Sequence, residues 1–242
     1  MAVRLKSVSI NQTLRLASKA LVASLLLYWL RSSGFGGGVT LLYILVFLLF
    51  YLKPTLNNGR FTPSAFSLLI IPFFLPLVSG PSEILFIASW GLSLFLLLGV
   101  KNLVLMQRKN SYRIVHFTIV AALGSLLLSR FGFLSQAVIF VTLLFVFREF
   151  YMTVTTADGE RPTLIAALEA FIFVQISWVL SFLSTDVLVG GAFLTLFAFI
   201  FHDTTTHRLT GTLTKSIIVR NGALFGILTL VILIISIKGA II

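Results

Sequence analysis

The residue of this sequence best suited to unusual chemistry is Glu169, an acid within a long apolar run. An ionisable side chain is costly to bury in such a run, so it is a functional candidate by default. Three further polar residues, Gln175, His116 and Arg220, are predicted to lie at depths from which they could join it in a polar cluster. The cluster could relay a proton or a cation, or contact a ligand. It could equally be an ion pair that holds two helices together, and the sequence leaves this choice open.

A second group of polar side chains follows another apolar run, in segment 202–208. His202, Asp203 and His207 could ligate a divalent metal, because imidazole nitrogens and carboxylate oxygens are common metal ligands. The two histidines are five residues apart, a spacing that does not place them on one face of a helix. We therefore expect no metal and no cofactor. We interpret the segment as a solvent-exposed loop whose Asp and Thr residues cap short turns.

Several catalytic motifs do not occur in this sequence. There is no paired-carboxylate motif for metal-dependent prenyl or phosphoalcohol transfer, no GxSG, no HExxH, no Walker A and no GxGxxG. The sequence also contains no Cys, which excludes disulfides, thiolate metal sites and cysteine nucleophiles. A catalytic role is therefore less favoured than a non-enzymatic one.

The composition identifies the environment that these residues occupy. Of 242 residues, 58% are hydrophobic and only 10% are charged, whereas a soluble domain is about 25% charged. This excludes a soluble globular protein, a disordered chain and a nucleic-acid-binding domain. The sequence predicts an all-α, polytopic transmembrane helical bundle. The net charge of +11 indicates cytoplasmic loops that face anionic lipid headgroups, so membrane lipids are the expected partners.

The elements that position the candidate residues are apolar runs near the length of a membrane span. A bilayer core about 30 Å thick needs roughly 20 residues of helix. This criterion predicts about nine spans, or eight if the first, which contains Arg15 and Lys19, does not fully cross. Together they make residues 1–242 a single integral membrane domain. The predicted spans are 14–30, 36–52, 64–80, 83–100, 114–130, 132–150, 163–182, 186–201 and 217–237.

The basic residues predict an orientation for these spans. Fifteen of the 18 lysines and arginines fall on one side when alternate connections are assigned to opposite sides of the membrane. Basic loops remain in the cytoplasm, so the N-terminus is expected there and the C-terminus outside. The external connections are short, which predicts a set of helical hairpins. We expect a cell membrane, with a bacterial plasma membrane as the favoured choice.

Two prolines lie inside the third predicted span. Pro72 and Pro76 are spaced at i and i+4, lack backbone N–H groups, and are expected to kink that helix. Each proline frees a carbonyl on the preceding turn. In lipid such a carbonyl needs a partner from a neighbouring helix, a hydroxyl or water.

The sequence leaves open whether a four-helix unit recurs along the chain. Markers near helix ends repeat at an offset of 99 residues, which suggests units 14–112 and 113–216 followed by a final span, 217–237. Parallel repeats are common in membrane proteins. The alternative is that helical hairpins in general repeat the same turn residues. The three marker pairs are Arg31 and Arg130, Pro63 and Pro162, and Gly91 and Gly190.

One stretch of the sequence carries a family resemblance. Leu168-Glu169 is followed by Trp178-Val179-Leu180-Ser181-Phe182-Leu183, and a second apolar span then ends in His202-Asp203. This stretch of about 40 residues resembles uncharacterised multi-pass membrane proteins of small-genome bacteria, in which a Glu precedes Trp-x-Leu-x-Phe-Leu-Pro. Ser184 stands where those proteins have the proline. The resemblance implies a membrane protein and no particular activity.

Three functions remain open from the sequence. The favoured one is a non-enzymatic membrane subunit or scaffold, with a membrane protein or a second copy of the chain as its partner. The second is a transporter or permease component for a small solute or ion that uses Glu169. The third is a lipid-handling enzyme at the cytoplasmic face that uses His202, Asp203, His207 and Glu149.

Overall fold

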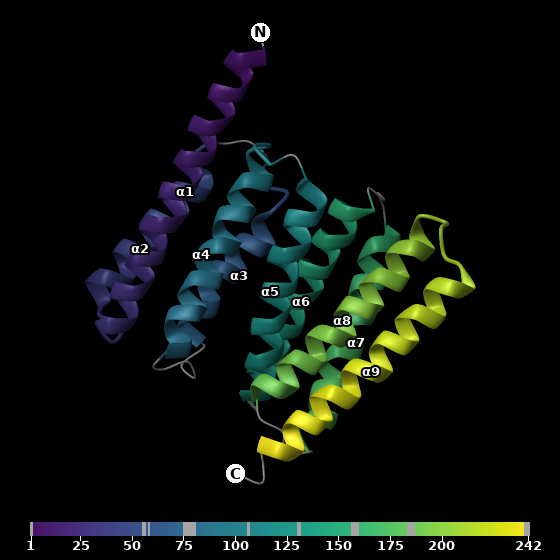
Figure 1. Cartoon of the computed structure of the whole chain (residues 1–242). Coiled ribbons are helices and arrows are strands. Elements are labelled where there is room, and N and C mark those ends of the chain that lie inside the picture. The colour runs from purple at the N-terminus through teal and green to yellow at the C-terminus, as the bar shows by residue number, and fades with distance from the viewer. Residues whose placement is uncertain are drawn as a thin grey trace. The chain divides into compact units, whose positions relative to one another are not determined.

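The structure, a computed structural model, describes residues 2–54, 57, 59–74, 81–105, 107–129, 132–155, 160–182 and 187–239. These residues form nine helices joined by turns and contain no strand (Figure 1). The prediction of an all-α chain is confirmed. The helices are α1 (Ala2–Ser32), α2 (Gly37–Leu52), α3 (Thr62–Phe74), α4 (Pro81–Lys101), α5 (Arg108–Ser129), α6 (Phe133–Val154), α7 (Glu160–Ser181), α8 (Val187–Leu209) and α9 (Lys215–Gly239).

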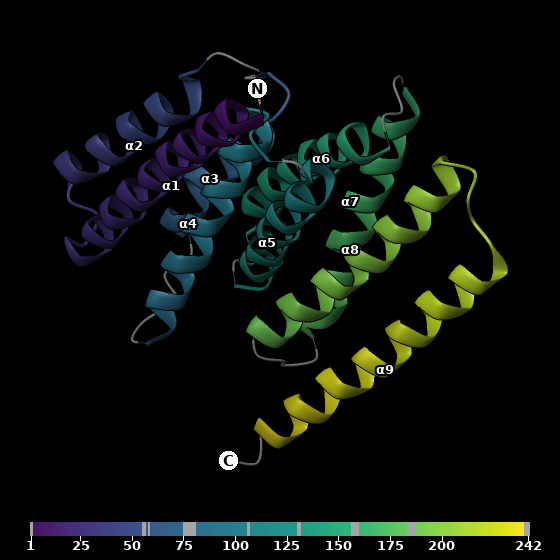
Figure 2. The same cartoon turned by 45° about the horizontal axis from the view of Figure 1, so that its top comes forward.

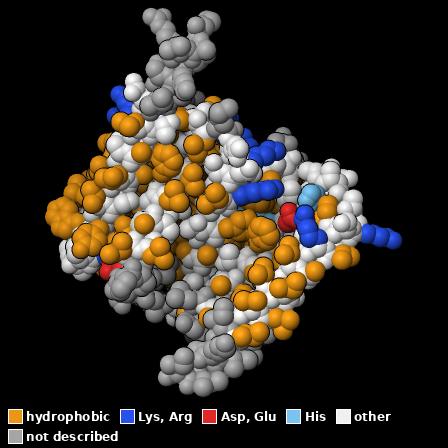
Figure 3. Space-filling model, in the orientation of Figure 1, with side chains coloured by type: hydrophobic (Ala, Val, Ile, Leu, Met, Phe, Trp, Pro, Cys, Tyr) orange, Lys and Arg blue, Asp and Glu red, His pale blue; other side chains and the backbone are white. Residues whose placement is uncertain are grey.

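Six helical segments in the described part of the chain are long and apolar enough to cross a membrane. Helices α2 and α3 are shorter apolar helices, and α8 joins an apolar first half to a polar final part. Hydrophobic side chains cover much of the face seen in Figure 3. These features are those of an integral membrane protein. The six segments are Asn11–Ser32, Glu83–Lys101, Arg108–Ser129, Phe133–Val154, Arg161–Ser181 and Lys215–Ile232.

Glycine and proline set several of the helix ends. After α1 the chain turns through Gly34, whose φ of 62° is in the left-handed region that glycine adopts without strain. Helix α8 ends in the same way at Gly211, with φ 71°. There the Thr212 N–H donates to the His207 carbonyl over 2.9 Å, which satisfies a carbonyl at the helix end. Pro81 opens α4, where a missing N–H costs little.

Helix α8 corrects one expectation from the sequence. Segment 202–208 was expected to be a loop, but it forms the last turns of α8, which ends at Leu209. Apolarity ends near residue 201, whereas the helix continues until Gly211 caps it. The span predicted from hydrophobicity therefore ends before the helix does, and residues 202–209 belong to α8.

Pro72 lies inside α3, as predicted, two residues before its end at Phe74. Because Pro72 has no N–H, the carbonyl of Leu68 loses its partner in the helix. The indole Nε1–H of Trp90 on α4 donates to that carbonyl over 2.8 Å, and both residues are buried. A neighbouring helix thus satisfies the carbonyl freed by Pro72. Pro76 lies outside the described residues.

The chain divides into two compact units, Met1–Thr118 and Ile119–Ile242, with the boundary inside α5. In the first unit, α1 packs against α2 and α4, and α3 packs against α2 and α4. Its core contains an aromatic group in which Tyr43 and Phe47 of α2 each lie 6.0 Å from Trp90, measured between ring centroids. At one end, Arg31 and Glu83 form an ion pair at 2.7 Å that joins α1 to α4.

The second unit contains α6 to α9 and the C-terminal half of α5. Helix α7 packs against α6 and α8, and α9 packs against α8 (Figures 1 and 2). Gly124 of α5 faces Leu194 and Phe173, so α5 also reaches α7 and α8. The fully buried side chains include Phe147 and Phe150. The polar groups described next lie among these rings.

Candidate functional site

The candidate site is a buried group of three side chains from three helices, Glu169 of α7, His202 of α8 and Tyr151 of α6, which we call the Glu169 cluster. The His202 Nδ1 atom lies 2.5 Å from Glu169 Oε1. The Tyr151 hydroxyl donates to Glu169 Oε2 over 2.8 Å. Glu169 and Tyr151 are fully buried, and His202 is 1% exposed. Both oxygens of the acid therefore have polar neighbours within the protein.

Aromatic rings surround the imidazole of His202. The Tyr151 ring stacks on it at 5.2 Å with an interplanar angle of 19°. Phe150 and Phe147 meet it edge-on, at centroid distances of 4.3 and 4.9 Å. These three residues lie on α6 at positions i, i+3 and i+4, so one face of that helix supplies the whole wall. The wall fixes the ring orientation and excludes water from the Glu169 contact.

The chemistry of the Glu169 cluster follows from its burial. A carboxylate removed from water is tolerated when a cation or hydrogen-bond donors compensate it. Tyr151 donates a hydrogen bond to one oxygen of Glu169, and the His202 Nδ1 atom lies beside the other oxygen. The cluster therefore holds α6, α7 and α8 together through polar contacts.

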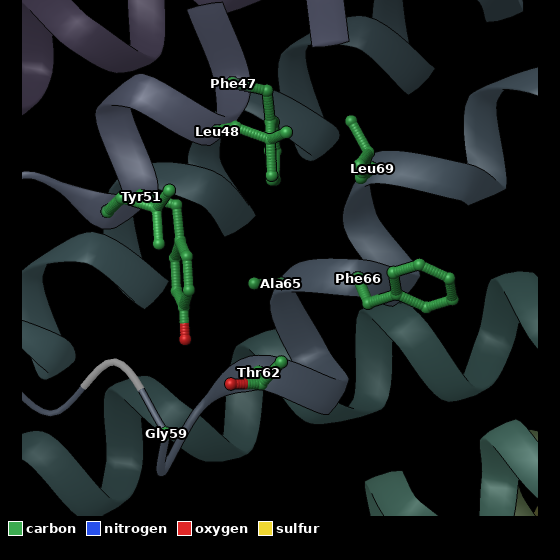
Figure 4. A pocket seen from close by; sticks show the side chains of 9 residues that line it. Phe47, Leu48, Tyr51, Gly59, Thr62, Ala65, Phe66 and Leu69 are labelled. Carbon is green, nitrogen blue, oxygen red and sulfur yellow. The ribbon is translucent and has the colours of Figure 1, made fainter. Parts of the chain in front are cut away.

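Two surface pockets of the described chain lie elsewhere. One, of about 350 Å³, lies between α2 and α3 and is lined by Phe47, Leu48, Tyr51, Leu52, Gly59, Thr62, Ala65, Phe66 and Leu69 (Figure 4). The other, of about 420 Å³, is lined by Phe133, Gln136, Trp178, Ser181 and Phe182. In the second, the Trp178 indole N–H donates to Gln136 Oε1 over 2.8 Å. Neither of these pockets is lined by a member of the Glu169 cluster.

Within the second unit, the structure places two other residues of the predicted polar cluster, Arg220 and Gln175, apart from Glu169. Arg220 donates to Asp203 Oδ2 over 2.9 Å and also contacts its neighbour Asn221. Gln175 is exposed on α7, because six residues of helix turn it away from the face of Glu169. His116 is buried in the first unit, with its ring 6.1 Å from that of Tyr112. The partner of Glu169 is instead His202, which sequence analysis had assigned to a loop.

The candidate metal ligands of segment 202–208 separate into two networks. His202 faces Glu169, whereas Asp203 lies with Arg220 at the end of α8 and His207 Nε2 is 3.8 Å from Asp203 Oδ1. In the described part of the chain, no three or more His, Cys, Asp or Glu side chains gather as metal ligands would. The helical conformation causes this separation, since residues five apart point in different directions.

Sequence analysis missed a second buried charged group, Lys101 at the end of α4. Its side chain is fully buried, and its Nζ donates to the backbone carbonyls of Tyr51 and Pro54, the latter over 2.7 Å. The same atom lies 4.7 Å from the centre of the Tyr51 ring. A cation at these carbonyls complements the negative C-terminal end of α2. The position of Lys101 directly after an apolar run resembled an ordinary interfacial anchor, so sequence alone did not distinguish it.

No known protein family matches this chain, and no curated protein or solved structure shows significant similarity to it.

Proposed function

We propose that this chain is a non-catalytic, multi-pass membrane subunit or scaffold in which Glu169 has a structural role. The observation that supports this proposal is the enclosure of Glu169. The acid is fully buried, each of its oxygens has a polar neighbour within the unit, and neither pocket described above reaches it. A transport site would have to expose the acid to a path for its cargo.

Reconstitution into liposomes tests this function. The wild-type protein and Glu169→Gln are compared for proton and monovalent-cation flux under an imposed gradient, and for thermal unfolding in mild detergent. We expect no flux that depends on Glu169 and a lower unfolding temperature for the variant, because Gln cannot form an ion pair with His202. A flux that Glu169→Gln abolishes while the unfolding temperature stays unchanged would contradict the proposal and favour the transporter.

The proposed topology has nine crossings, with the N-terminus in the cytoplasm and the C-terminus outside a bacterial plasma membrane. Its support is the charge distribution, in which 15 of the 18 basic residues fall on one side. Helices α2 and α3, at 16 and 13 residues, are then short crossings within the first unit. A bilayer accommodates such helices by local thinning or by interfacial side chains.

Single-cysteine labelling tests the topology directly, because the chain contains no Cys. Ser33→Cys, in the α1–α2 turn, is expected to react with a membrane-impermeant maleimide added outside intact cells. Gly59→Cys, in the α2–α3 connection, is expected to react only after the cells are opened. Both positions are exposed, so labelling reports on sidedness rather than on burial. Labelling of both from the same side would overturn the assignment.

A further inference from the structure

The pocket between α2 and α3, which we call the α2–α3 groove, has one polar end and one apolar end. Its lining side chains carry only two polar atoms, the hydroxyl oxygens of Tyr51 and Thr62, and both lie at the end where the chain passes Gly59 (Figure 4). Leu69 lines the groove seven residues further along α3, so its hydrocarbon part extends over about 10 Å. A ligand with a polar head and an apolar chain matches this gradient.

Exposed apolar side chains form the edges of the groove. Leu48, Leu52 and Phe66 all line it, and each is exposed on the surface of its helix. In a membrane protein such side chains contact lipid tails, which are as apolar as leucine. The groove is therefore entered from the lipid phase, and an acyl chain is the part of a ligand that fits its walls.

Basic residues gather at the polar end of the groove. Lys53 and Arg60 each directly follow a lining residue in the sequence, and both are exposed. Lys19 of α1 also reaches this end, because its Nζ donates to the Lys53 carbonyl over 2.8 Å. The first residue of α3 lies at the same end, so the positive end of the α3 dipole adds to the charge of these side chains.

The first unit contains almost no acid to balance this charge. Among residues 1–118 of the sequence the only Asp or Glu is Glu83, which is paired with Arg31 at 2.7 Å. Arg31 lies twelve residues from Lys19 on α1, or about 18 Å along the helix, so Glu83 belongs to the opposite end of the unit. The positive charge beside the groove is therefore complementary to an anionic ligand.

A buried side chain holds the polar end of the groove in place. Lys101 of α4 is fully buried, and its Nζ donates to the carbonyls of Tyr51 and Pro54, on either side of Lys53. The Asn57 side-chain amide donates in turn to the Lys101 carbonyl over 3.1 Å. These contacts fix the C-terminal end of α2 and thus one wall of the groove. A wall that is already ordered lowers the entropic cost of binding.

We propose that the α2–α3 groove binds one anionic phospholipid, with an acyl chain between the two helices and the phosphate at Lys53 and Arg60. A soluble anion would leave the apolar walls unused, and a neutral lipid would leave the basic end without a complementary charge. The site contains no member of the Glu169 cluster, so it does not depend on the role of Glu169.

Lipid titration of the purified full chain in mild detergent, followed by native mass spectrometry, tests this site. Phosphatidylglycerol and phosphatidylcholine with identical acyl chains are compared, so that only the headgroup differs. We expect one phosphatidylglycerol to bind roughly tenfold or more tightly than phosphatidylcholine, because two basic side chains attract its net negative charge. Lys53→Gln combined with Arg60→Gln is expected to remove this preference.

The matched control removes the same charge from the second unit. Arg208 and Lys215 are exposed near the ends of α8 and α9, and Arg208→Gln combined with Lys215→Gln is expected to keep the preference for phosphatidylglycerol. Equal binding of the two lipids by the wild type, or an equal loss of the preference in both double variants, would overturn the proposal.

A groove-filling variant tests where the acyl chain lies. Leu48→Trp adds bulk to the groove at an exposed position, and Leu49→Trp makes the same change at the next residue, which is exposed and does not line the groove. We expect Leu48→Trp to weaken phosphatidylglycerol binding by roughly tenfold, and Leu49→Trp to leave it unchanged, at equal unfolding temperatures. Binding that survives Leu48→Trp, or that both variants lose, would show that the acyl chain does not occupy the groove.

Discussion

At the scale of single residues, two buried ionisable groups are compensated by different kinds of partner. Glu169 is compensated by side chains, a His and a Tyr from two other helices. Lys101 is compensated by backbone, the carbonyls at the C-terminal end of α2. In both cases the partner lies within the same unit. Both groups therefore contribute to the cohesion of their unit, and their removal is expected to affect stability first.

The pairing of Glu169 with His202 predicts a strong coupling between these positions. Glu169→Leu or His202→Leu alone leaves one buried polar partner uncompensated, and each is expected to cost about 3–5 kcal/mol of unfolding free energy. The double variant is expected to be more stable than the sum of the two effects, by about 1–3 kcal/mol. Thermal unfolding of the four proteins in one detergent measures this coupling.

The half-exposed pair of Asp203 and Arg220 is the control for this cycle. Solvent screens such a pair, so Asp203→Asn is expected to cost at most about 1 kcal/mol. Additive effects of the Glu169 and His202 substitutions would show that the short contact does not stabilise the unit.

Lys101 gives a second prediction at this scale. Lys101→Met keeps the apolar stem but removes the donor to the carbonyls of Tyr51 and Pro54, and is expected to cost about 2–3 kcal/mol. Lys19→Met is the comparison, because Lys19 donates to the Lys53 carbonyl over 2.8 Å from a more exposed position. Unfolding temperatures in detergent should fall clearly further for Lys101→Met. A larger fall for Lys19→Met would contradict this account.

At the scale of the elements, α3 illustrates how the sequence tolerates a proline in lipid. Pro72 breaks one hydrogen bond of the helix, and the Trp90 indole of α4 replaces it at the Leu68 carbonyl. The backbone of α3 therefore depends on a side chain of α4 for this hydrogen bond. Without the Trp90 donor, the buried carbonyl that Pro72 frees would lack this hydrogen bond.

This arrangement predicts a rescue. Trp90→Phe leaves the buried Leu68 carbonyl without that donor and is expected to cost about 1–3 kcal/mol. In the background of Pro72→Ala, where the backbone N–H of residue 72 can donate to the same carbonyl, Trp90→Phe should cost measurably less. The four proteins are compared by thermal unfolding. An identical cost in both backgrounds would show that Pro72 and Trp90 are independent.

Two glycines of the second unit, Gly191 and Gly226, predict a contrast between equivalent substitutions. Gly191→Ala places a methyl group 2.3 Å from the Ser125 hydroxyl and is expected to cost about 1–3 kcal/mol, because either the hydroxyl or one of the two helices must shift. Gly226→Ala adds the same methyl group where the chain leaves open space, and should not lower the stability of the monomer. Unfolding of both variants under monomeric conditions measures the difference. Equal costs would contradict the packing described for α5 and α8.

At the scale of the whole molecule, the pattern of apolar runs was sufficient to predict every described helix. Each of the nine predicted spans overlaps one helix of the structure. The pattern was insufficient at the helix ends, where capping rather than apolarity decides, and this explains why His202 was assigned to a loop. It was also insufficient for contacts between helices. Almost every residue in these helices is apolar, so hydrophobic periodicity does not indicate which face packs against which neighbour.

The candidate site was predictable only in part for the same reason. Glu169 could be selected because an acid in an apolar run is rare and costly. Its partners could not be selected, because they lie on two other helices, 18 residues before it and 33 residues after it in the sequence. The proposed crossing count rests on the lengths of the apolar runs, and the proposed orientation rests on the distribution of the basic residues.

The separation of these partners along the chain bears on biogenesis. During synthesis, Glu169 enters the membrane with Tyr151 already made, but His202 leaves the ribosome only 33 residues later. Likewise, Lys101 is made 50 residues after Tyr51, whose carbonyl it contacts at the C-terminal end of α2. The two buried groups can therefore be fully paired only when α4 and α8 have been made, and a nascent chain arrested before that point would expose unsatisfied polar groups to lipid. We expect membrane quality control to recognise such arrested chains by these exposed polar groups.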